Sequence, residues 1–132
     1  MEPAVHAAPR QWRETVVKYM LLIYGDEDKM RAIPKEDASK MMPAYVAYTE
    51  ALKKAGILLG GDRLQFTETA TTVRIRDGKT NVVNGPYAEA KEQLAGYYLI
   101  DVPDMDSALS WASRCPGASA GTVEVRPLWV MQ

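Results

Sequence analysis

The chain has 132 residues, a length typical of one domain, and its 47% hydrophobic and 25% charged residues argue against disorder throughout. The 16 basic and 17 acidic residues nearly balance, and without a basic block the sequence has no electrostatic footprint for nucleic acid. No apolar run approaches the roughly 18 residues of a membrane span, so we expect a soluble protein with no membrane partner.

Single cysteine and histidine residues limit the chemistry. Cys115 alone cannot form an internal disulfide or a cysteine-type zinc site, which fits a reducing compartment. His6 lies in a loose N-terminal segment, so acid–base chemistry would depend on carboxylates, tyrosines or a lysine. We expect neither a metal nor a cofactor, because no phosphate loop, dinucleotide-binding glycine pattern or metal-ligand spacing occurs.

Residues 1–16 show no clear hydrophobic period and no signal-peptide core, which predicts a disordered or swapped extension ahead of a domain over residues 17–132. Patterning begins at Lys18–Tyr24, a short apolar run that predicts a central strand buried on both faces. Pro34–Ala55 carries one apolar stripe and predicts a helix, in which Pro43 should cause a kink or a fresh start.

A short extended piece at Ile57–Gly61 precedes the strongest local signal in the chain. Thr71–Arg76 and Lys79–Val83 flank Asp77-Gly78, and two β-rich runs joined by Asp-Gly predict a hairpin. A polar loop opened by Asn-Gly-Pro follows. The remaining predicted elements are a strand at Leu94–Val102, a helix capped by Asp104 or Asp106 and ended by Cys115-Pro116-Gly117, and a strand at Thr122–Val130.

The resulting order is β-α-β, hairpin, β-α-β, which predicts an α+β, ferredoxin-like fold with an antiparallel sheet and an inserted hairpin. Two helices can cover only one face of such a sheet. Because the strands are apolar enough to need cover on both faces, a second copy is the simplest cover. The sequence therefore predicts a homodimer with facing sheets and a pocket between them.

The loop after the hairpin carries a family resemblance. The stretch NGPYAEAKEQLAGYYLIDV resembles the DGPFAETKE signature of the YCII-related, DGPF-type family. The segments KYMLLIYGDE, ATTVRIRDGK and GTVEVRPLWV are similar to the flanking strands and hairpin of that family, in the same order. The resemblance runs from about Lys18 to Val130 and leaves the N-terminal extension outside it.

The resemblance implies a dimeric α+β barrel in a cytoplasmic bacterial protein, often associated with sigma factors of the extracytoplasmic-function type. Related branches carry a proposed His–Asp pair in the pocket, which this chain lacks. Asn84 also stands where the family usually has Asp, and an amide cannot act as a general base because it does not ionise.

Candidate pocket residues come from three places. In the loop, a rigid turn could present Asn84 to a ligand, although a tight turn with solvated charges explains the same residues. Glu124 and Arg126 share one face of the last strand, where they would form a buried pair if that face lines the dimer cavity. The full set of ligand-binding candidates is Tyr24, Tyr45, Asn84, Gly85, Pro86, Glu89, Lys91, Glu92, Glu124 and Arg126.

Two functions fit these residues. One is a pocket protein for a small molecule, with cofactor-free isomerase-like or lyase-like proton transfer on an aromatic or lactone-like compound. The other is a non-catalytic ligand sensor or accessory protein of a sigma-factor circuit, to which the absence of the histidine and of the motif Asp points. The sequence names neither the ligand nor the catalytic residues.

Overall fold

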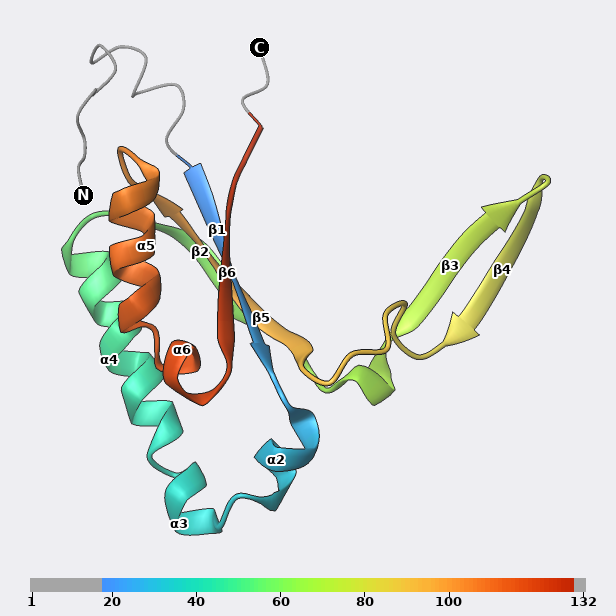
Figure 1. The fold of residues 1–132 in the computed structure, drawn as a ribbon, viewed down its shortest axis with the longest axis horizontal. Helices are drawn as coiled ribbons and strands as arrows, with labels where there is room; N and C mark the ends of the chain where they lie inside the picture. Colours follow the sequence, from blue (N-terminus) through green and yellow to red (C-terminus); the bar gives the residue numbers. More distant parts are fainter. Residues whose placement is uncertain (1–17, 130–132) are drawn as a thin grey trace.

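The computed structural model describes residues 18–129 and shows a mixed α+β fold with helices on one face of an antiparallel sheet (Figure 1). The predicted extension over residues 1–16 and the last position of the final predicted strand lie outside the described residues. The strands are β1 (Lys18–Gly25), β2 (Leu58–Arg63), β3 (Thr71–Arg76), β4 (Lys79–Asn84), β5 (Gln93–Asp101) and β6 (Thr122–Pro127). The helices are α2 (Glu27–Ala32), α3 (Lys35–Ala38), α4 (Met41–Lys54), α5 (Met105–Arg114) and α6 (Pro116–Ala120), with a 3₁₀ turn η1 (Thr67–Thr69).

The main sheet has the order β2-β5-β1-β6, with every neighbouring pair antiparallel. The apolar strand β1 is central, as its sequence predicts. Because side chains alternate along a strand, Tyr19, Leu21 and Ile23 are buried against the helices. The α+β class with an antiparallel sheet is therefore confirmed, whereas the ferredoxin-like topology and the dimeric barrel stay predictions.

The core lies between the sheet and the pair α4 and α5. Leu21, Leu52 and Ile100 have no exposed surface, and Cys115 is 1% exposed. The buried phenol of Tyr48 on α4 donates a hydrogen bond to the carbonyl of Trp111 on α5 at 2.7 Å, which ties the two helices together. No helix within residues 18–129 is long and apolar enough to cross a bilayer.

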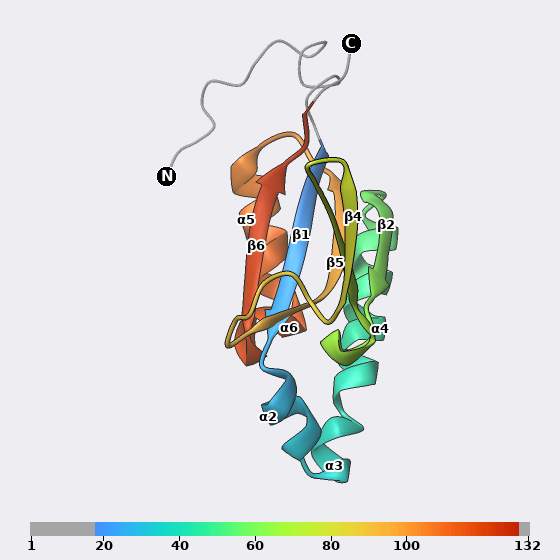
Figure 2. The same ribbon diagram turned by 90° about the vertical axis from the view of Figure 1, so that its right-hand side faces the viewer.

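The opposite side of the sheet is covered by neither α4 nor α5 (Figure 2). We call it the open face, and its apolar members alternate with the buried residues of β1 and β5. Register places Met20 opposite Leu99, and Leu22 opposite Tyr97. The open face includes Met20, Leu22, Tyr24, Tyr97, Leu99, Glu124 and Arg126.

The predicted hairpin is confirmed and forms a two-stranded sheet of its own. Asp77 and Gly78 have φ angles of 52° and 75°, which is the left-handed conformation that a tight hairpin turn requires. The hairpin projects away from the domain on the side of the open face (Figures 1 and 2). We call residues 71–84 the arm.

The long helix predicted over Pro34–Ala55 is wrong, because the structure has two helices there. The short α3 ends at Ala38, and α4 begins at Met41. Pro43 therefore lies in the first turn of α4, where its missing N–H has no helical partner to lose. Pro43 was expected to cause either a kink or a fresh start. The separate helix α4, with Pro43 in its first turn, corresponds to the fresh start.

Candidate functional site

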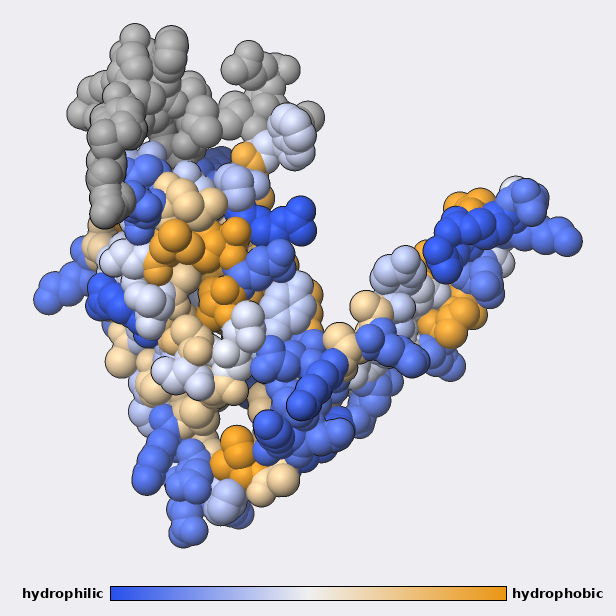
Figure 3. Space-filling view, viewed as in Figure 1, coloured by the Kyte–Doolittle hydropathy of each residue, from blue (hydrophilic) through white to orange (hydrophobic). Residues whose placement is uncertain are grey.

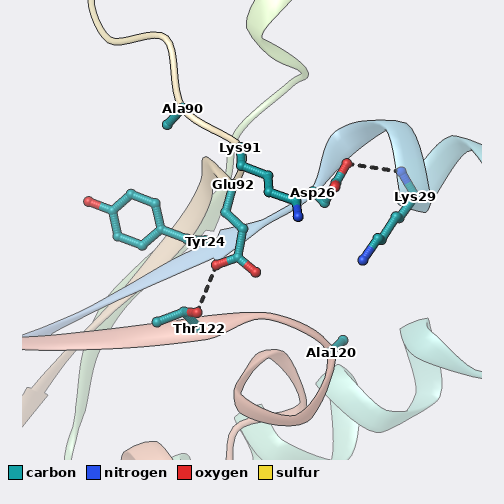
Figure 4. Close-up of a pocket in the computed structure, with 8 residues that line it drawn as sticks. All are labelled: Tyr24, Asp26, Lys29, Ala90, Lys91, Glu92, Ala120 and Thr122. Atoms are coloured by element: carbon teal, nitrogen blue, oxygen red, sulfur yellow. Dashed lines mark hydrogen bonds between the residues drawn. The ribbon is translucent and has the colours of Figure 1, made fainter.

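A hollow of about 550 Å³ lies where β1 ends, at one end of the open face. One wall comes from β1 and β6, and the other from α2 and the loop that leads into β5 (Figure 4). This volume falls within the roughly 300–1,000 Å³ of known small-molecule sites. The lining residues are Tyr24, Asp26, Lys29, Ala90, Lys91, Glu92, Ala120 and Thr122.

Two lysines give the hollow its cationic groups. Lys29 extends from α2 and Lys91 from the loop, and both side chains project into the space between α2 and the start of β6 (Figure 4). Within residues 18–129, neither ammonium group has an ion-pair partner within 4.0 Å. Both positive charges are therefore available to an anion.

The two carboxylates of the hollow are already engaged. Asp26 is the N-cap of α2, and its side chain accepts a hydrogen bond from the backbone N–H of Lys29 at 3.1 Å. Glu92 accepts a hydrogen bond from the hydroxyl of Thr122 at 2.7 Å. Asp26 thus fixes the direction of α2, and the Thr122 contact orients the Glu92 carboxylate.

Tyr24 forms an aromatic wall, and its hydroxyl points away from the lysines (Figure 4). The phenol donates a hydrogen bond to Oε1 of Glu124 at 3.3 Å. Partial desolvation and the adjacent Glu124 carboxylate together raise the pKa of Tyr24. The phenol is therefore neutral at physiological pH and presents an uncharged ring face to the hollow.

The structure brings only some of the predicted site residues together. Tyr24, Lys91 and Glu92 line the hollow, and Glu124 contacts Tyr24 from the open face. Arg126 is exposed on the same strand, and no ion pair joins it to Glu124 within the described chain. The predicted carboxylate–guanidinium pair is thus absent from the single chain.

The Asn-Gly-Pro segment lies at the base of the arm rather than in the hollow. The N–H of Gly85 donates to the carbonyl of Ala70 at 2.7 Å, and its own carbonyl accepts from the hydroxyl of Thr72 at 2.8 Å. Gly85 has a φ of 115°, which favours glycine. Asn84, Pro86 and Glu89 are exposed beside this turn.

Tyr45 belongs to the opposite side of the sheet. It packs against the helix-side core, where burial and the nearby Cys115 thiol raise its pKa. It does not line the hollow. Across residues 18–129, no cluster of three or more His, Cys, Asp or Glu side chains is placed to hold a metal ion.

The YCII-related domain model matches residues 17–132, which is most of the chain. The chain belongs to this family. A protein of Rhizobium meliloti (strain 1021) that is described as "Uncharacterized protein R00369" is 42% identical over 112 residues, which cover 83% of this chain and 90% of that protein. The YCII-related resemblance in the sequence is therefore confirmed, while the DGPF type stays a prediction.

Sequence reasoning missed the part of this candidate site that α2 supplies. No helix was predicted between the strand at Lys18–Tyr24 and Pro34, although Asp26 is of a type favoured at the N-cap. Lys29 lies one turn further along the same helix. A helix of six residues is too short to show an apolar period. The available signals were the Asp26 cap and the acidic residues Glu27 and Asp28 in the first turn.

The structure also reveals a buried carboxylate that the sequence did not single out. Glu27 is 6% exposed, and it accepts hydrogen bonds from the N–H and hydroxyl of Thr67 at 2.9 and 2.7 Å. Its own N–H donates to the side chain of Gln93 at 3.0 Å. Glu27 therefore connects α2 to η1, at the base of the arm, and to the start of β5.

Proposed function

We propose that this YCII-related protein binds a small organic anion in the hollow, with an aromatic or other planar carboxylate as the best fit. One observation carries the proposal: the ammonium groups of Lys29 and Lys91, which have no ion-pair partner among residues 18–129, face one concave site beside the ring of Tyr24. The lysines would attract the carboxylate, and the aromatic wall would contact a flat apolar body.

The expected affinity is modest, because the hollow is open to solvent. Contacts between exposed charges contribute about 0.2–1 kcal/mol each. Removing one lysine should therefore weaken binding by up to about five-fold. Binding should also weaken as salt is added, since the ammonium groups are screened.

Binding is tested with benzoate as the probe, by two-dimensional NMR of the full chain. We expect shift changes at residues that line the hollow, and a higher Kd for benzoate in Lys29→Ala and Lys91→Ala. Lys54→Ala is the matched control, because this lysine is exposed on α4, outside the hollow. Benzyl alcohol has a similar ring without the charge and should bind more weakly. Shifts scattered over the surface, or equal effects of all three lysine variants, would refute the proposal.

A second candidate function is cofactor-free proton transfer on the bound molecule. It is favoured by Glu92, whose carboxylate faces the hollow and is oriented by Thr122. A base must lie within about 2.6–3.2 Å of the proton that it removes, and a fixed carboxylate meets that requirement more easily than a mobile one. Loss of turnover in Glu92→Gln, with benzoate binding retained, would support this role.

The assembly that fits this site is a homodimer with paired open faces. Met20, Leu22, Tyr97 and Leu99 form an apolar strip that α4 and α5 leave uncovered, and strips of this kind commonly mark interfaces. Sedimentation velocity tests the pairing, and Leu22→Lys should shift the chain towards monomer. The association with a sigma factor stays a prediction from the family resemblance.

A further inference from the structure

The arm makes few contacts with the rest of the described chain, of which one is the Arg74 guanidinium over the ring of Tyr87. Every residue of β3 and β4 except Thr72 is exposed, and within residues 18–129 the two strands pair only with each other. Val73, Ile75 and Val82 are 59%, 63% and 59% exposed. An isolated two-stranded hairpin is marginally stable in water, so this element needs a surface to pack on.

The two sides of the arm differ in chemistry. Register pairs Val73 with Val82, and Ile75 with Thr80, which places three apolar side chains on one side. The other side carries Arg74 and, nearest the turn, the opposed pair Arg76 and Lys79. Figure 3 shows apolar side chains on the arm next to strongly hydrophilic ones.

The base of the arm is held in place by contacts that involve α2, η1 and the two ends of the hairpin. Glu27 binds both donors of Thr67 immediately before β3, and Gly85 bonds to Ala70 and Thr72 across the ends of the hairpin. Arg31 adds an ion pair to Glu68. These contacts direct the arm outwards, past the open face (Figure 1).

We propose that the arm clasps a second copy of this chain, with each arm of a two-fold dimer lying against the partner. This inference rests on the homodimer proposed above. A strand of six residues spans about 20 Å, whereas facing sheets pack about 10 Å apart. When the open faces meet, the outer half of each arm passes beyond the sheet-to-sheet gap and reaches the flank of the partner.

Charge complementarity favours a second copy as the occupant. The whole chain has a formal net charge of -1, yet the arm carries Arg74, Arg76 and Lys79 against Asp77 alone. The remainder of each chain is therefore net negative, and it attracts the cationic arm of its partner. The apolar side of the arm, from Val73 to Val82, is buried in the same contact.

Sedimentation velocity of the full chain at several concentrations tests the clasp. We expect Val73→Lys to weaken self-association at least ten-fold, because it places a charge on the apolar side. Val46→Lys is the matched control: Val46 is 53% exposed on α4, away from the arm, and its replacement should leave the dimer Kd within two-fold. Val73→Thr keeps a β-branched residue and should weaken the dimer less.

If Val73→Lys disturbs the hairpin itself, hydrogen exchange provides a second test of the clasp that needs no substitution in the arm. In the unsubstituted chain, the amides of β3 and β4 should exchange more slowly at concentrations that favour the dimer than after dilution. Unchanged arm exchange, with Leu22→Lys still dissociating the dimer, would overturn the clasp and leave the paired sheets standing. A chain that is monomeric at every concentration would overturn both, while benzoate binding would test the hollow separately.

Discussion

Replacing Glu27 with alanine tests how the arm is attached to the domain. The carboxylate is 6% exposed and accepts two hydrogen bonds from Thr67, at 2.9 and 2.7 Å. Hydrogen bonds to charged groups contribute about 1.5–3 kcal/mol each, and two bonds that share one carboxylate add less than fully. The substitution also leaves the Thr67 N–H without its acceptor. We expect the free energy of unfolding to fall by about 2–4 kcal/mol.

Urea denaturation followed by circular dichroism measures this loss. Asp28→Ala is the control, because Asp28 is exposed in the same first turn of α2 and should lose only about 0.3–1 kcal/mol of interaction with the helix dipole. A double-mutant cycle with Thr67→Val isolates the hydroxyl bond, with an expected coupling of at least about 0.5 kcal/mol. Equal stability of the Glu27 and Asp28 variants would show that the buried carboxylate does not hold the arm.

Two further predictions concern close packing and burial in the sheet and core. A Cβ on Gly61 would lie 2.7 Å from the carbonyl oxygen of Tyr97, whereas one on Gly60 would meet nothing within 4 Å. Thermal unfolding should therefore show that the free energy of unfolding falls by about 1–3 kcal/mol for Gly61→Ala and changes little for Gly60→Ala. Similar losses in the two variants would contradict this prediction. Burial raises the pKa of Tyr45 and Tyr48, so their contribution to stability is complete below about pH 10 and is lost as pH rises further. Near-ultraviolet absorbance, followed as pH rises, measures the ionisation of the two phenols. If both ionise at the same pH as free tyrosine, the prediction is refuted.

The sequence predicted the strands and the hairpin well, because each depends on local pattern. The apolar run of β1 and the Asp77-Gly78 turn carry their signals within a few residues. The helix over Pro34–Ala55 was begun too early, since its first residues form the separate short helix α3, which has no buried residue. The apolar pattern starts only at Met41, where α4 begins. Helix-start residues such as Pro34 and Glu36 mark where a helix begins, but not how far it runs.

The candidate site was harder to predict, because it is assembled from separate segments. Lys91 and Glu92 attracted attention through the polar loop and the family resemblance, and both line the hollow. Thr122 and Lys29 are ordinary polar residues in the sequence. They line the hollow because tertiary structure brings β6, α2 and the loop together. Tyr45 was misleading because the spacing of a helical tyrosine cannot show which side of the sheet it faces.

The short helix α2 links the proposed ligand site of this YCII-related protein to the arm that we propose clasps the partner. Asp26 and Lys29, three residues apart, face the hollow, while Glu27 and Arg31, four residues apart, bind the base of the arm. One turn of helix thus serves a ligand site on one face and an assembly element on the other. It follows that Lys29→Ala should change benzoate binding without changing the dimer, because Lys29 lies on the hollow side of α2, whereas Glu27 and Arg31 make the contacts with the base of the arm.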